Sequence, residues 1–392
     1  MVTRPRPHLY ASVAGLLKAP ELALWIVYLL ITPFYVWKSG RPQPADGVLL
    51  VLLLYLARQG LPALPSALRS AFVAILMFAA YAALVNLAWG VLLLDYDVQK
   101  VGALGFASFY VFNALVFGAC LLLYQRNGMR FVAVTAWASV AALLLQLALF
   151  AIKGDTSLFR EKLFFNNPNQ LGYYALLSAA IVAFTYQRAR LPLMLAGAAL
   201  AIATLFAASS LSKAALIGTA VMAGVAAIRK PVLVAVTATV LLVGMNLRDP
   251  SELVDRVTFR MQDMGSQEDD TLEGRGYSRI EMHPQYLVLG AGEVGHDRHG
   301  DFGGELHSSW ATVLFSYGVA GTAILLVFFW HALRFLRPLD WLFPLPIFWY
   351  GVTHQGLRFR LFWVFIGLVC VVAYHSRMVA VRRARIAAGA NR

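Results

Sequence analysis

The residue best suited to proton transfer in this 392-residue chain is His307. It lies in the run GGELHSSW (303–310), where a long polar stretch ends and an apolar segment begins. The imidazole of histidine changes its protonation state near physiological pH and can take a proton from a hydroxyl group. Ser308 or Ser309 can cap the helix that the apolar segment predicts. A histidine that only ends a loop is the alternative interpretation.

Arg160 is the second candidate and lies on a shorter polar stretch. It precedes NNPNQ (166–170), a composition typical of a turn that also caps the following helix. A guanidinium group presents a planar fork of donors that matches a pair of phosphate oxygens. Arg160 could instead pair with Glu161 or with lipid headgroups, and Lys162 is a weaker candidate for the same role.

Three further cations could complete an anion site. Arg275 and Arg279, in GRGYSR (274–279), are four residues apart. On a helix this spacing puts both on one face, where they would form a good diphosphate site. The glycines here and in GAGE (290–293) let backbone approach a ligand closely. Lys213 adds a cation after a serine-rich stretch. Each of these charges could also be an ordinary solvated one.

Two stretches contain the side-chain types that bind metal ions. His296 and His299 form an H-x-x-H pair, and Asp95-Tyr96-Asp97 contains a carboxylate pair of the kind that holds a divalent cation in some membrane enzymes. Neither stretch has a cysteine or a fixed four-ligand spacing, so we expect no metal and no cofactor. The metal-ligand types around the first pair are Glu293, His296, Asp297, His299, Asp301, Glu305 and His307.

The composition places the chain in a membrane. Hydrophobic residues make up 60% of it and charged residues 14%, and the mean hydropathy is +0.67, far outside the range of soluble globular proteins. We therefore expect an all-α polytopic membrane protein, with residues 1–392 as a single integral membrane domain. The net charge of +13 could indicate nucleic acid, but the basic residues fall in short clusters between apolar runs, which indicates membrane topology instead.

The apolar runs predict about twelve transmembrane helices. Two polar stretches interrupt them: an outer loop at 153–170, and a large insert at 248–307 between spans nine and ten. Because hydrocarbon tolerates few polar groups, we expect the active site to lie in this insert. The expected spans are residues 21–37, 47–57, 71–94, 101–124, 131–152, 171–186, 191–208, 214–228, 231–247, 308–330, 342–352 and 361–374.

Charge placement predicts which side each gap faces. Cytoplasmic loops of membrane proteins carry an excess of Lys and Arg. If the N-terminus is placed inside the cell, every gap between spans that falls in the cytoplasm is basic. Both termini are then cytoplasmic, and the insert, with 13 of the chain's 20 acidic residues, faces the periplasm of a Gram-negative cell. The basic residues assigned to the cytoplasm are Arg4, Arg6, Lys18, Arg58, Arg69, Arg126, Arg130, Arg188, Arg190, Arg229, Lys230, Arg334, Arg337, Arg377, Arg382, Arg383 and Arg385.

Four motifs follow one another along the chain: Arg160 before NPNQLG (167–172), SSLSK (209–213), Arg275 before LGAG (289–292), and HSSW (307–310) leading to YGVAG (317–321). Their order and sidedness resemble the O-antigen polymerase and O-antigen ligase superfamily. The resemblance covers about residues 150–330. One departure is Lys213, where the family usually has arginine after serine.

The resemblance implies a fold like that of C-type membrane glycosyltransferases (GT-C). Such an enzyme takes a glycan from undecaprenyl diphosphate at the periplasmic face of the bacterial inner membrane and passes it to a sugar hydroxyl, without metal. Arg160 and Arg275, with Arg279 and Lys213 as further candidates, would hold the diphosphate. His307 would serve the acceptor hydroxyl as a base or orienting group. Direct displacement by that hydroxyl would invert the anomeric centre.

Three functions remain open on these grounds. We expect an O-antigen or exopolysaccharide polymerase, whose acceptor is another lipid-linked repeat unit, because the insert is modest in length. An O-antigen ligase, whose acceptor is the lipid A-core glycan, is the alternative. A lipid-linked glycan transporter is less favoured, because transporters usually place their charged sites near mid-membrane. The expected partners are the lipid-linked donor, a glycan acceptor and membrane lipids, with no nucleic acid.

Overall fold

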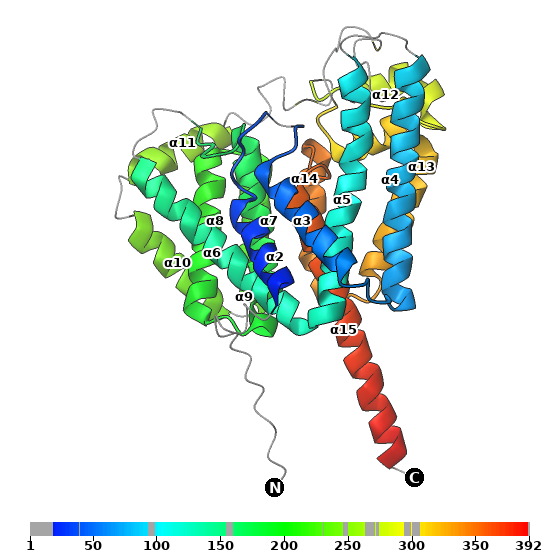
Figure 1. The fold of residues 1–392 in the computed structure, drawn as a ribbon. Coiled ribbons are helices and arrows are strands. Elements are labelled where there is room, and N and C mark those ends of the chain that lie inside the picture. Colours follow the sequence, from blue (N-terminus) through cyan, green and yellow to red (C-terminus); the bar gives the residue numbers. More distant parts are fainter. Residues whose placement is uncertain are drawn as a thin grey trace.

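The fold is helical throughout the part of the chain that the structure describes. The computed structural model describes residues 19–38, 40–92, 99–153, 160–229, 231–245, 250–262, 271, 274–293, 299 and 306–390. Within these ranges no strand is present, so the all-α prediction is confirmed. Figure 1 shows most of the helices standing side by side in one bundle.

Each of the twelve apolar segments predicted from the sequence falls on a helix. The described part of the insert also contains the helices Pro250–Gln262 and Ser278–Met282 and the 3-10 turn Pro284–Leu287, which the apolar pattern did not indicate. The elements are α2 (Pro20–Ile31), α3 (Pro44–Arg58), α4 (Ser66–Leu92), α5 (Gln99–Asn127), α6 (Met129–Lys153), α7 (Pro168–Ala189), α8 (Leu193–Ser210), α9 (Lys213–Arg229), α10 (Pro231–Met245), α11 (Pro250–Gln262), α12 (Ser278–Met282), η2 (Pro284–Leu287), α13 (Ser309–Leu333), η4 (Pro338–Leu342), α14 (Pro344–Thr353) and α15 (Arg360–Ala390).

Six described helices are long and apolar enough to cross a membrane, namely α4, α5, α6, α8, α13 and α15. They support a membrane protein but are fewer than the twelve spans expected. The helices α2, α9 and α10 are apolar but shorter, and α14 has only 10 residues. The first span was expected to reach residue 37, but α2 ends at Ile31. Pro33 explains this, because a proline has no backbone N–H with which to continue the helical hydrogen bonds.

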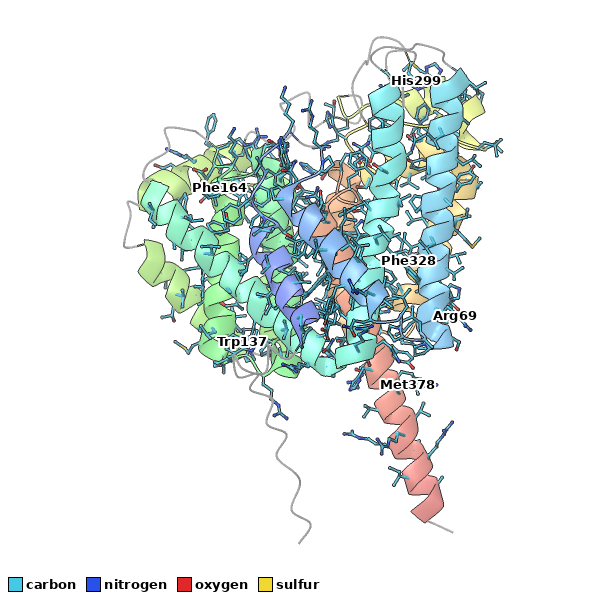
Figure 2. The ribbon with its side chains drawn as sticks, in the orientation of Figure 1. Arg69, Trp137, Phe164, His299, Phe328 and Met378 are labelled. Carbon is cyan, nitrogen blue, oxygen red and sulfur yellow. The ribbon has the colours of Figure 1, made fainter. Side chains whose placement is uncertain are left out.

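The helices form two groups with α15 between them. In Figure 1, α4, α5 and α13 stand together on one side and α6, α8, α9 and α10 on the other, and the lower part of α15 projects beyond the bundle. The upper part of α15 packs against α5, α7 and α13, which places it at the centre. Figure 2 shows His299 of the insert at the opposite end of the bundle from Arg69, as expected if the insert and the basic gaps face opposite sides.

A break in α13 ties the insert to the bundle. Gly318 has φ 64° and interrupts the helix, so nearby backbone groups lose their partners within it. The carbonyls of Phe315 and Ser316 accept hydrogen bonds from the N–H groups of Ala291 and Gly292, at 2.9 and 2.8 Å. Backbone pairing of this kind in place of helical bonds is tolerated in membrane proteins where protein surrounds it. It fixes the second half of the insert against α13.

A buried network of polar side chains reinforces this contact. One oxygen of the Glu293 carboxylate accepts from the Tyr317 hydroxyl at 2.5 Å, and the other accepts from the Arg358 guanidinium. Asn86 on α4 accepts from the Glu293 N–H at 2.7 Å and donates to the Tyr317 hydroxyl at 3.0 Å. The carboxylate is thus both paired and hydrogen-bonded, which a buried charge requires. The network joins α4, α13, the insert and the loop before α15.

Candidate functional site

Arg160 is held between two outer helix ends. Its Nε donates to the carbonyl oxygen of Ser210 at 3.1 Å, and its Nη2 donates to Oδ1 of Asn169 at 2.8 Å. The turn expected here is present, because the side chain of Asn167 accepts from the N–H of Gln170 at 3.0 Å and caps α7. The guanidinium therefore connects the start of α7 to the end of α8.

Lys213 lies at the same corner as Arg160, as the first residue of α9. Gly172 explains the close packing of this corner: a Cβ atom there would lie 2.7 Å from the Ser210 hydroxyl and 2.9 Å from the Ser212 Cβ. The glycine that ends the NPNQLG motif (167–172) thus lets α7 approach the serine-rich turn. The corner brings Lys213 to the side of the bundle on which Arg160 lies.

Arg275 and His307 are neighbours across the insert. The N–H of His307 donates to the carbonyl oxygen of Arg275 at 3.1 Å, while the Arg275 guanidinium donates to the carbonyl of Thr353 at the end of α14. The His307 side chain is exposed. Ser308 caps α13 as expected, accepting from the N–H of Ala311 at 3.2 Å. The backbone of His307 is therefore fixed against that of Arg275, and its side chain has access to solvent.

Two residues that the sequence did not single out join these groups. The Tyr350 hydroxyl donates to the backbone carbonyl of Asn169 at 3.0 Å, and Asn169 also holds Arg160. The Tyr350 ring stacks on His354, with centroids 4.5 Å apart. The structure thus brings Arg160, Arg275 and His307 into one cluster of contacting residues at one end of the bundle. The cluster consists of Arg160, Asn169, Tyr350, His354, Thr353, Arg275 and His307.

The electrostatics of His354 are consistent with this convergence. Burial is the main reason why the pKa of His354 is lowered to about 3, and the nearby groups Arg275, His307 and Arg160 contribute to the same shift. Groups more than a short distance away would have little effect on one ring. His354 is therefore an uncharged imidazole at neutral pH, with the guanidinium groups of Arg275 and Arg160 nearby. An arrangement of this kind favours an anion.

Arg279 does not share a helix face with Arg275, so that prediction is wrong. Gly276 adopts φ +78° between them, and α12 begins only at Ser278. Arg275 consequently lies in a turn ahead of the helix. The Arg279 side chain is buried and lines a narrow space with Arg358, and burial lowers its pKa. The geometry does not bring Arg279 to the cluster, and its phosphate role stays a prediction.

The described part of the chain contains no cluster of metal-ligand side chains. Among the described residues, no group of three or more His, Cys, Asp or Glu side chains could hold a metal ion. Glu293 is engaged by Arg358 and Tyr317, and the His299 ring packs on Phe315 with centroids 5.1 Å apart. The other candidate ligands lie outside the described residues, namely Asp95, Asp97, His296, Asp297, Asp301 and Glu305.

Comparison with known proteins identified no relative of this chain. The chain matches no protein-family model and no curated protein. The class that fold and site define is therefore a helical membrane protein with a cationic, histidine-containing cluster at one end of its bundle. The superfamily resemblance rests on the sequence motifs alone.

The low pKa of His354 predicts that this residue makes the fold sensitive to acid. Below the ordinary histidine pKa of 6.5 the unfolded chain takes up a proton, while folded His354 does so only near pH 3. Its contribution to stability is thus complete above pH 6.5 and is lost as the pH falls from 6.5 towards 3. When the pH is lowered from about 7.5 to about 5, we expect the Tm of the wild type to fall more than that of His354→Gln. Parallel Tm curves for the two proteins would contradict this.

Proposed function

We propose that the protein transfers a glycan from an undecaprenyl-diphosphate-linked oligosaccharide to a sugar hydroxyl at the periplasmic face of the bacterial inner membrane. The observation that carries this proposal is the convergence of Arg160, Arg275 and His307 at one end of an apolar helical bundle. A ligand that is both lipid-anchored and dianionic fits a cationic cluster at the edge of a membrane. That the reaction transfers a sugar is inferred from the resemblance of the motif order to the superfamily.

The chemistry needs few groups. The acceptor hydroxyl oxygen forms a bond to the anomeric carbon while the bond from that carbon to the diphosphate oxygen breaks. His307 takes the hydroxyl proton, and Arg160 and Arg275 stabilise the charge that grows on the leaving diphosphate. Fixed guanidinium groups are effective here because they need no reorganisation as the charge develops. Displacement in one step inverts the anomeric centre, without a covalent intermediate.

The number of membrane crossings and the orientation of the chain are part of the same proposal. Twelve helices crossing the membrane, with both termini cytoplasmic and a GT-C-like arrangement, would put the cluster in the periplasm. The position of the cluster at one end of the bundle favours an enzyme over a transporter, whose charged sites usually lie near mid-membrane. Of the two enzymes, we propose the polymerase, with the ligase as the alternative that differs only in acceptor.

Purified protein given a defined donor tests this function. Undecaprenyl-diphosphate oligosaccharide is supplied in proteoliposomes, together with lipid A-core glycan. We expect a longer lipid-linked glycan as product. A core-linked glycan would identify a ligase instead, and the absence of either product would reject the proposal.

Arginine variants show whether that product depends on the cluster. Arg160→Ala is expected to lower the rate about 100-fold or more, in the range found when one charge-stabilising group is removed. Arg58→Ala serves as the matched control, because Arg58 is an exposed arginine at the C-terminal end of α3 and makes none of the contacts of the cluster. Equal rates for the two variants would contradict the role of Arg160.

A further inference from the structure

We propose that His354 is a third group that contacts the donor, with its Nε2–H donating a hydrogen bond to a diphosphate oxygen between Arg160 and Arg275. This inference rests on the proposed function. It adds a residue from the short loop between α14 and α15, a gap in which the sequence indicated no chemistry. The evidence is the way in which the ring is fixed, the state of its two nitrogens and the groups that surround it.

The His354 ring is held firmly in place. It stacks on Tyr350 at an interplanar angle of 24°, and Tyr350 stacks in turn on the buried Tyr173, with centroids 4.0 Å apart. The His354 backbone is fixed as well, because its carbonyl accepts from the N–H and the hydroxyl of Ser309 at 3.1 and 2.9 Å and from the N–H of Gly356 at 2.9 Å. A side chain ordered to this degree loses little entropy when it binds a ligand.

The two ring nitrogens have different surroundings. Nδ1 lies 2.8 Å from the hydroxyl oxygen of Thr353, a normal hydrogen-bond distance. No hydrogen bond from the described part of the chain reaches Nε2, and the side chain is partly exposed. The Thr353 hydroxyl also lies 3.4 Å from the Tyr350 carbonyl oxygen, but its contact with Nδ1 is much shorter, so we take its proton to point to Nδ1. The proton of the neutral ring then sits on Nε2. That nitrogen is then a donor available to a ligand.

The positive charges near the ring favour an anion as that ligand. Arg275, His307 and Arg160 all act on the ring, and Arg275 donates to the backbone carbonyl of Thr353, the residue next to it. The ring stays neutral among them, so it offers a hydrogen bond without adding a further positive charge to the cluster. Because both guanidinium groups are near enough to act on the ring, a diphosphate that they hold would lie within reach of this donor.

Two substitutions separate this contact from the stacking role of the ring. His354→Phe keeps an aromatic ring on Tyr350 and removes Nε2–H, while His354→Gln restores an N–H donor at a similar reach. We expect His354→Phe to weaken binding of undecaprenyl diphosphate about tenfold or more, the usual effect of losing a hydrogen bond to a charged group. His354→Gln should recover part of that loss. Binding is measured by native mass spectrometry in lipid nanodiscs, with Tm as the check on folding.

Each outcome has one meaning. If the wild type binds undecaprenyl diphosphate and His354→Phe binds it equally well, His354 is not a ligand contact and this inference fails alone. If the wild type itself does not bind, the proposed function fails with it. Should His354→Phe not fold, Thr353→Val gives the answer. It removes the hydroxyl that fixes the Nε2–H form, so weaker binding supports the proposal and unchanged binding overturns it.

Discussion

Replacing His307 with alanine is expected to lower the rate of glycan transfer by about 100- to 10,000-fold, the range that a positioned acid or base contributes. The substitution should leave the fold intact, because the His307 side chain is exposed and its structural contact is made by the backbone N–H to Arg275. The measurement is the initial rate of product formation by purified protein, alongside Tm. Loss of activity at unchanged Tm is the expected result.

His283→Ala is the matched control for this experiment. His283 is also a histidine of the insert, but its ring neighbours are Tyr286 and His299, with centroids 6.2 and 5.3 Å away. We expect this variant to keep most of its activity. Transfer at the wild-type rate by His307→Ala, or equal losses in the two variants, would contradict the assignment of His307 as the base.

Gly290→Ala should prevent the insert from docking and sharply lower the stability of the protein. A Cβ atom at this position would lie 2.3 Å from the Ser316 carbonyl oxygen and 2.5 Å from the Tyr317 Cα, and φ at Gly290 is +99°. The backbone atoms it meets belong to α13 and cannot move aside like a flexible side chain. A left-handed conformation costs a non-glycine residue about 1–2 kcal/mol, and overpacking adds about 1–3 kcal/mol.

Gly60→Ala isolates the effect of the backbone conformation. Gly60 has φ +82°, but a Cβ atom added there would have no neighbour within 4 Å. We expect this variant to lose only the conformational contribution, so its Tm should fall much less than that of Gly290→Ala. Equal losses of Tm or of folded yield would show that the docking of residue 290 on α13 is not as close as the structure describes.

Local patterns predicted much of the framework. Each apolar run that was expected to be a helix falls on one, because burial and lipid exposure are set by composition over about 20 residues. The caps at Asn167 and Ser308 were also predictable, since each depends on a side chain within three residues of its partner. The number of spans was less predictable, because helix length depends on where each helix ends.

Long-range contacts account for what the sequence did not reveal. Glu293 and Arg358 are 65 residues apart. Arg160 and Tyr350 are joined through the side chain and the backbone of Asn169. The only local signal for His354 was its position in a short polar gap between two apolar runs. The positive φ of Gly276, which separates Arg275 from Arg279, likewise has no signature beyond the glycine itself.

The central claim is that Arg160 and Arg275 lie close enough to hold one lipid diphosphate. The most direct test is the affinity of nanodisc-embedded protein for undecaprenyl diphosphate and for undecaprenyl monophosphate, in the wild type and in Arg160→Gln, Arg275→Gln and the double variant. We predict that the wild type prefers the diphosphate and that each single substitution removes most of that preference, with little further loss in the double variant. Wild-type preference for the diphosphate in the double variant would contradict the site described here.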